Sequence, residues 1–223
     1  MPLGLLPVRG HERGDLRARG AVRRLPAAQP GYGIRRQPAL DASRRAAEAR
    51  HVGGRHRDSI PLSFSVANPD FDADLDDIAA IWDSGVRIFK LKTGFANHAF
   101  DLMRLEKLRH IYGEEARLRI DYNQGLAAFD AIRHIRDLEA FRPEFVEQPV
   151  RMFEREALAE ITRAVDVPIM ADESVFDVRD ATRAAANRMA DIFSLKTAKS
   201  GGIRRCIEIA AIARAAGIEV YGG

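Results

Sequence analysis

The feature that most constrains the fold is a regular alternation of short apolar runs and amphipathic stretches from Gly54 onward. Short apolar runs are typical of buried strands, and apolar residues at helical spacing are typical of helices that cover a sheet. Strand followed by helix, repeated with short loops, predicts parallel strands joined by helical crossovers. The predicted strands are 62–67, 87–91, 118–121, 145–147, 168–171, 192–195 and 218–221, and the predicted helices are 74–82, 98–111, 127–141, 154–164, 178–186 and 203–216.

Seven strands and six helices are nearly a (β/α)8 barrel, which takes about 250 residues. The predicted fold class is therefore α/β, an incomplete TIM-type barrel that lacks the last strand. In an open barrel of this kind the first and seventh strands are unpaired edges, which favour aggregation. We assign this partial barrel to residues 53–223.

Residues 1–52 differ from the barrel in composition. They are rich in Arg, Gly, Pro and Ala and contain no lysine, since the first lysine of the chain is Lys90. A segment of low hydrophobicity and high charge usually cannot bury enough surface to fold. Translation of a GC-rich coding sequence in the wrong reading frame also produces arginine-rich, lysine-free segments. Two interpretations stay open, a disordered arm and a misframed segment; only 39–52 has a helical pattern.

The composition limits the class of protein. An apolar fraction of 46% is ordinary for a globular domain with a sizeable core. The only cysteine, Cys206, excludes an internal disulfide, fits a reducing cytoplasm and is expected in the core. No apolar run approaches the roughly 20 residues of a membrane span, and the N-terminus has no apolar signal-type segment. The net charge of +3 reflects the arginine-rich segment, where no aromatic residues alternate with the arginines as nucleic-acid stacking platforms.

The residues after each predicted strand indicate the chemistry, because active sites of such barrels form at the C-terminal ends of the strands. Three acids, Asp121, Glu147 and Asp172, end the third, fourth and fifth strands. They would form an oxygen-only site that selects a hard cation, Mg²⁺ or Mn²⁺. Each acid alone fits an exposed loop or a helix N-cap. Their place on three successive strands, flanked by lysines, favours the metal site.

Lysines end the second and sixth strands. Lys90 and Lys92 are two residues apart on a strand, so both point to the same face. If that face is the barrel interior, each lowers the pKa of the other and one can act as a base; the alternative is two solvated lysines. Lys196, four strands away, would face the other side of a substrate held on the metal. Lys199 either belongs to the site or supports the turn before the next helix.

Several of these segments resemble motifs of one family, the muconate lactonising branch of the enolase superfamily. The segment 89–94 resembles its KxK strand, and 193–202 resembles the strand of its second catalytic lysine. The segments 119–124, 146–149 and 169–174 resemble its three metal-ligand strands. The segment 216–223 resembles the next strand, and within the branch the match is best to the muconate and chloromuconate cycloisomerases.

The resemblance implies a (β/α)7β barrel capped by a separate α+β domain, and a metal that binds the substrate carboxylate and stabilises an enediolate. Lys92 would be the acid/base, with Lys90 lowering its pKa, and Lys196 would stabilise charge on the other face. The ligands would be Asp121, Glu147 and Asp172 to Mn²⁺ or Mg²⁺. Two further residues, Asn123 and Glu173, would fix the surroundings of the metal.

The implied reaction is the lactonisation of cis,cis-muconate in aromatic catabolism, by a cytoplasmic and homo-oligomeric enzyme that acts on a small carboxylate. A dipeptide epimerase, an o-succinylbenzoate synthase and an N-acylamino acid racemase keep the same residues and stay open as alternatives. From other classes, the arginine-rich segment permits a nucleic-acid binder, and a non-catalytic subunit is a third reading. Residues 1–52 do not resemble the capping domain, and the eighth strand is absent, so an inactive fragment is a further hypothesis.

Overall fold

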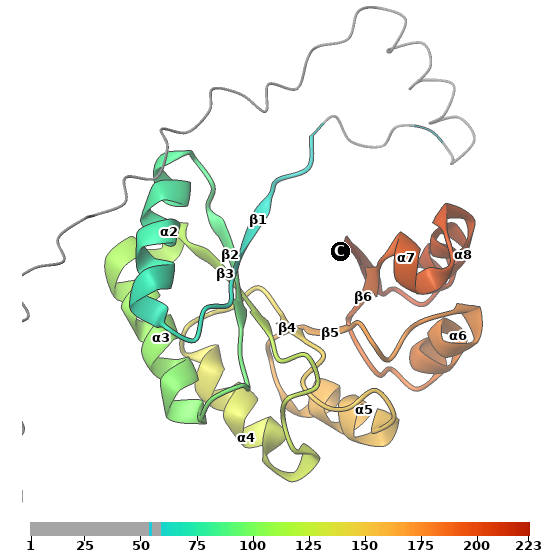
Figure 1. Ribbon diagram of the computed structural model, residues 1–223. Helices are drawn as coiled ribbons and strands as arrows, with labels where there is room; N and C mark the ends of the chain where they lie inside the picture. Colours follow the sequence, from blue (N-terminus) through green and yellow to red (C-terminus); the bar gives the residue numbers. More distant parts are fainter. Residues whose placement is uncertain (1–53, 55–58) are drawn as a thin grey trace, which may run out of the picture. The chain divides into compact units, whose positions relative to one another are not determined.

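The structure, a computed structural model, describes Gly54 and residues 59–223. In this part of the chain seven strands form one sheet in the order β1 to β7, and every neighbouring pair is parallel. The sheet curls, and the helices cover its outer side (Figure 1). Within the described residues β1 and β7 are the two edge strands. The predicted incomplete TIM-type barrel is confirmed.

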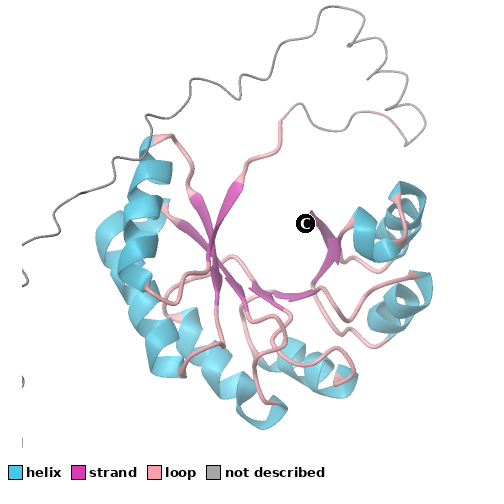
Figure 2. Cartoon of the chain, viewed as in Figure 1, coloured by secondary structure: helices cyan, strands magenta, loops and turns pink. Residues whose placement is uncertain are grey.

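The observed elements follow the predicted ones closely (Figure 2). The strands are β1 Ser63–Val66, β2 Ile88–Lys92, β3 Arg117–Asp121, β4 Val146–Glu147, β5 Ile169–Ala171, β6 Ile192–Leu195 and β7 Glu219–Gly222. The helices are α2 Phe71–Asp83, α3 His98–Tyr112, α4 Ala128–Glu139, α5 Arg155–Ala164, α6 Val178–Ala186, α7 Thr197–Ser200 and α8 Ile203–Ala215, with the 3₁₀ helix η1 at Gly113–Glu115.

Two short elements, α7 and η1, were not predicted, because a single turn carries no amphipathic period. Helix α2 begins three residues before the predicted start, since the side chain of Asp70 accepts a hydrogen bond from the backbone N–H of Asp72 and caps the helix there. The predicted helix 39–52 and the two interpretations of residues 1–52 lie outside the described residues.

The core lies between the sheet and the helices. In β2 the side chains of Phe89 and Leu91 are fully buried, and Phe89 stacks near Trp82 of α2 and Tyr112 of α3. Successive side chains of a strand point to opposite faces. Lys90 and Lys92 therefore project from the other, concave face of the sheet.

The concave face is partly filled by an arginine. Arg119 of β3 donates from Nε to Glu144 at 2.7 Å and from Nη1 to the hydroxyl of Tyr221 in β7 at 3.3 Å. Its guanidinium also lies 5.2 Å from the ring centroids of both Phe145 and Tyr221. Strands far apart in the sheet are thus linked through the inner side of the curl.

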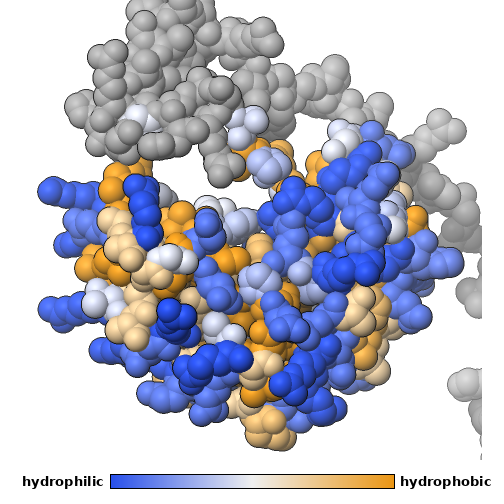
Figure 3. All heavy atoms as spheres, turned by 180° about the vertical axis from the view of Figure 1, so that it is seen from behind, coloured by the Kyte–Doolittle hydropathy of each residue, from blue (hydrophilic) through white to orange (hydrophobic). Residues whose placement is uncertain are grey.

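Hydrophilic residues cover most of the outer rim, with apolar residues visible between them (Figure 3). In the described part of the chain no helix is both long and apolar enough to cross a membrane. Cys206 is only half-buried, so its expected place in the core is wrong. The reason is its position in the first turn of α8, where the fully buried residues begin later, at Ile209.

Candidate active site

The predicted site residues lie at the carboxyl edge of the sheet. Asp121 and Glu147 are the last residues of β3 and β4, and Lys92 is the last residue of β2. The register aligns Lys92 with Asp121 and Asp121 with Glu147. Because parallel strands in register end at the same edge, three βα units bring these side chains together. Asp172 and Lys196 directly follow β5 and β6 at the same edge.

A first cluster joins the ends of β2, β3 and β4. The ammonium of Lys90 lies 2.8 Å from Glu147 Oε2 and 3.8 Å from Asp121 Oδ2. The ammonium of Lys92 lies 2.6 Å from Asp121 Oδ2 and 2.7 Å from Asn123 Oδ1. We call these five residues the first cluster. In it Lys90 bridges the acids of β3 and β4, whereas Lys92 binds the end of β3 and the loop that follows it.

Glu147 is the least compensated acid of the first cluster. Its side chain is fully buried, and Oε1 has no hydrogen-bond partner among the described residues. Burial, together with the negative charges of Asp121 and Asp172, raises the pKa of Glu147 to about 7, although Lys90 opposes the change. The buried carboxyl therefore lies where one more positive charge would be stabilising.

A second cluster joins the ends of β5 and β6 and consists of Asp172, Lys196 and Lys199. Lys196 Nζ pairs with Asp172 Oδ2, and Lys199 Nζ lies 2.8 Å from Asp172 Oδ1. Burial alone would raise the pKa of Asp172, but the two ammonium groups outweigh it and hold that pKa below its usual value. Burial would lower the pKa of Lys196, yet the contact with Asp172 raises it.

The two clusters lie at one site. We call this site, formed by both clusters at the carboxyl ends of strands β2 to β6, the mouth of the barrel. Asn123 Nδ2 donates to Glu173 Oε1 at 3.4 Å, which links the loop after β3 to the loop after β5. The charges of Glu147 and Glu173 both act on the pKa of Lys196. All the residues predicted from the sequence for this site are therefore neighbours in the folded chain.

Strained backbone surrounds the clusters. Asn123 and Gln124, after β3, have φ of 43° and 71°, and Gln148, after β4, has φ of 37°. Left-handed conformations of residues other than glycine cost energy and are concentrated at functional sites. Gly94, after β2, has φ of 78°, and a Cβ there would lie 2.9 Å from Tyr122 Cδ1. These turns are held by the surrounding structure.

Sequence reasoning missed residues that hold the loops. Gln148 Oε1 accepts hydrogen bonds from the backbone N–H of Asp172 at 3.0 Å and of Ser174 at 3.1 Å. The fully buried Arg104 of α3 donates from Nη2 to the carbonyl of Lys92 at 2.6 Å. Gln148 lies beside Glu147 in the segment 146–149, so the sequence does contain a signal for it. Arg104 offered none, because its role depends on how α3 docks.

The acids were expected to hold a metal. As they stand, no three His, Cys, Asp or Glu side chains within the described ranges are arranged to hold an ion. Lysine ammonium groups contact Asp121, Glu147 and Asp172 instead. The donor set still fits a hard divalent cation, because all donors are carboxylate oxygens and Glu147 Oε1 is buried without a partner among the described residues.

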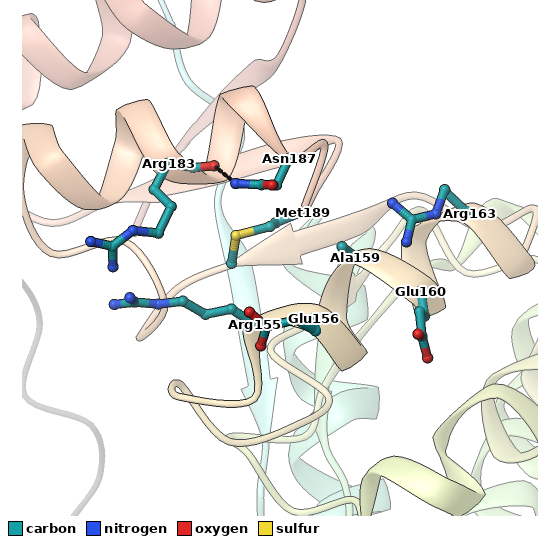
Figure 4. Close-up of a pocket in the computed structure, with 8 residues that line it drawn as sticks. All are labelled: Arg155, Glu156, Ala159, Glu160, Arg163, Arg183, Asn187 and Met189. Carbon is teal, nitrogen blue, oxygen red and sulfur yellow. Dashed lines mark hydrogen bonds between the residues drawn. The ribbon is translucent and has the colours of Figure 1, made fainter.

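A separate hollow of about 260 Å³ lies between α5 and α6 (Figure 4). Its lining includes Arg155, Arg163, Arg183 and Met189, and the carbonyl of Arg183 accepts a hydrogen bond from Asn187 Nδ2 at 2.8 Å. The predicted site residues do not line this hollow in the described part of the chain. It is therefore distinct from the clusters at the strand ends.

Comparison with known proteins identifies the family to which residues 74–223 are similar. The model described as "Enolase C-terminal domain-like" matches residues 74–223. The chain is 46% identical to a muconate cycloisomerase of Azorhizobium caulinodans, whose crystal structure superposes with a TM-score of 0.73 over 78% of this chain and 48% of that one.

Two curated relatives have different activities. The chloromuconate cycloisomerase of Cupriavidus pinatubonensis is 38% identical over 77% of this chain and 47% of its own length. The L-Ala-D/L-Glu epimerase of Clostridium acetobutylicum is 36% identical over 75% of this chain and 46% of its own. The chain thus spans about half the length of the relatives that it matches.

Proposed function

Because this chain belongs to the enolase superfamily, we propose that its site moves a proton beside a substrate carboxylate with the help of a divalent cation. The proposed reaction is the cycloisomerisation of cis,cis-muconate or a chlorinated muconate. One observation carries the proposal: Lys90 and Lys92 come from β2 and Lys196 follows β6, and the acids of β3, β4 and β5 lie between them. Proton donors thus flank the acids from both sides.

The proposed metal ligands are Asp121, Glu147 and Asp172, with Mg²⁺ or Mn²⁺ as the ion. A cation there would withdraw charge from the substrate carboxylate and make the adjacent C–H more acidic. Asn123 and Glu173 contact each other beside these acids and are proposed to fix the side-chain directions. Glu147 gains most from the added charge, since burial and two neighbouring acids already raise its pKa.

Exposure divides the lysines into two kinds. The side chains of Lys92 and Lys196 are 32% and 36% exposed, whereas those of Lys90 and Lys199 are 12% and 8% exposed. A group that exchanges a proton with substrate must be reachable from the mouth. Lys92 is therefore proposed as the acid/base, and the less exposed Lys90 as the fixed charge beside it.

In the proposed reaction an oxygen of one carboxylate of cis,cis-muconate bonds to the carbon γ to that carboxylate. This carbon is joined by a double bond to the carbon beside the second carboxylate, and the π electron pair of that double bond moves to the latter carbon. Lys92 Nζ delivers a proton to that carbon, so one C–O and one C–H bond replace the π bond. Lys196 is proposed to stay cationic and to stabilise negative charge on the opposite side.

Dipeptide epimerisation is the second candidate, favoured by the 36% identity to an L-Ala-D/L-Glu epimerase. An epimerase removes a proton on one side of a carbon and returns it on the other. Lysines on both sides suit that reaction, but each lysine must then alternate between amine and ammonium. Cycloisomerisation is placed first because of the higher identity, 46%, to a muconate cycloisomerase.

The test begins with the metal. The unfolding midpoint of the purified chain is measured with and without millimolar Mn²⁺ or Mg²⁺, for the wild type, Asp172→Asn and Asp72→Asn. Asp72 is an 85% exposed control. A ligand that binds only the folded state raises the midpoint. We expect a rise for the wild type and Asp72→Asn and little for Asp172→Asn; equal rises in all three would exclude the metal site.

Activity separates the two reactions. Loss of muconate absorbance is compared with solvent deuterium exchange at the α-carbon of L-Ala-L-Glu. Turnover of muconate alone supports the first proposal, and exchange into the dipeptide alone supports the second. A metal-dependent midpoint without either activity contradicts both substrates but leaves the metal site standing.

A further inference from the structure

Lys199 is the most enclosed lysine of the mouth. Its side chain is 8% exposed, and its ammonium donates to Asp172 Oδ1 at 2.8 Å, to the Asp172 carbonyl at 2.7 Å and to the Ser194 carbonyl at 2.8 Å. An ammonium group has three N–H donors. Every donor of Lys199 thus has an acceptor, and the group has no proton left for substrate.

Aromatic cover completes the enclosure. The ammonium of Lys199 lies 5.8 Å from the ring centroid of Phe176, in the loop before α6. Lys196, at the start of the same turn of α7, differs in both respects: its side chain is 36% exposed, and its ammonium meets the other oxygen of Asp172, Oδ2. One carboxylate therefore holds a buried ammonium on one oxygen and a reachable ammonium on the other.

We propose that Lys199 is a positioning residue for Asp172. It fixes the carboxylate by Oδ1 and by the backbone carbonyl, so that Oδ2 is the oxygen presented to the mouth and Lys196 is not needed to hold it. The proposal deepens the proposed function and rests on it where Asp172 binds a cation. Two of the three acceptors belong to Asp172, which a support for the α7 turn alone would not require.

The first test measures Mn²⁺ affinity by water-proton relaxation in the wild type, Lys199→Met, Lys199→Arg and Lys196→Met. Loss of a charge-assisted hydrogen bond that orients a ligand is expected to weaken binding about tenfold in Lys199→Met. Arginine keeps the charge and the donors, so Lys199→Arg is expected to recover part of the affinity. Lys196→Met removes a competitor for Oδ2 and is expected to bind at least as tightly as the wild type.

Lys107→Met is the matched control, since Lys107 is 42% exposed and pairs with the surface acid Asp72. Its Mn²⁺ affinity is expected to equal that of the wild type. Wild-type affinity in a folded Lys199→Met overturns the proposal, and so does an equal loss in Lys196→Met. Midpoints of unfolding without metal are recorded for all variants, so that a loss of folding is not read as a loss of affinity.

A second measurement needs no metal and no variant of Lys199. Reductive methylation of the native chain, mapped by mass spectrometry, is expected to modify Lys196 and Lys107 severalfold faster than Lys199. In Asp172→Asn the protection of Lys199 is expected to fall. If the wild type binds no Mn²⁺, the proposed metal site fails, while this labelling still decides whether Asp172 holds Lys199. Equal labelling of Lys199 and Lys107 in the wild type overturns the inference.

Discussion

The two halves of the mouth, the first and the second cluster, contain the same residue types but shift the pKa of a carboxylate in opposite directions. In the first cluster two lysines serve the acids of two strands, and the buried Glu147 stays under-compensated, with its pKa raised to about 7. In the second cluster two lysines serve one acid, and the pKa of Asp172 is lowered. Burial raises the pKa of both acids, and the number of ammonium groups at each acid decides whether that rise is reversed.

The largest expected effect comes from removing a buried counter-charge of the first cluster. Lys90→Met leaves Glu147 and Asp121 buried without their shared ammonium, and breaking a buried pair costs about 3 kcal/mol or more. The counterpart Lys196→Met is expected to cost at most about 1 kcal/mol, because that lysine is partly exposed and Lys199 still holds Asp172. Urea unfolding at pH 8 measures both, and equal losses would contradict the comparison.

The pH dependence of the metal-free chain should have opposite signs in the two halves. A raised folded pKa means that Glu147 retains protons on folding, so stability falls as pH rises from about 4.5 to about 7. Relative to the wild type, Glu147→Gln should gain stability over that range, on the order of 2 kcal/mol.

Asp172 behaves in the opposite way. Its folded pKa is lowered, so its contribution is present above the ordinary aspartate pKa of 3.8 and is lost as pH falls through the folded value. Asp172→Asn should be less stable than the wild type at neutral pH, and the two stabilities should converge in acid. Urea unfolding from pH 2 to pH 8 in EDTA measures both differences. Parallel curves for the two variants would refute the opposite assignments.

A smaller difference in stability is expected from backbone strain at one glycine beside each cluster. Gly94, beside the first cluster, has φ of 78° and no room for a Cβ next to Tyr122, so Gly94→Ala should cost about 2 kcal/mol. Gly201, after α7, has φ of 82° but its nearest atom would be Arg205 Cγ at 4.0 Å, so Gly201→Ala should cost about 1 kcal/mol. Thermal unfolding compares them; a costlier Gly201→Ala would reverse the ranking.

The smallest effect is expected at the exposed lysine of the first cluster. Lys92→Met removes a partly exposed pair with Asp121, and such pairs contribute about 1 kcal/mol or less. If Lys92 is the acid/base, Lys92→Met should also abolish any turnover of muconate that the wild-type protein shows. A stability loss equal to that of Lys90→Met, measured by urea unfolding, would show that exposure does not separate the two lysines.

Much of the barrel was predictable because its signals are local. The apolar runs that became β2, β3 and β6 and the amphipathic stretches that became α3 and α6 are periodic enough to read directly, and the elements end within one or two residues of the prediction. The short α7 and η1 were missed, since one turn has no period. Cys206 was misplaced, because helical spacing alone does not say how far along α8 the core extends.

By itself the sequence determined which residues stand at the strand ends, because parallel strands bring their carboxyl ends to one edge whatever surrounds them. It placed Lys90, Lys92, Asp121, Glu147, Asp172 and Lys196 at that edge. Only the tertiary structure decided which lysines are buried and which acid each one holds. Those properties depend on the register of the strands and on loops such as that of Gln148, which pack against residues distant in sequence. Residue spacing carries no record of burial, and burial sets the charges.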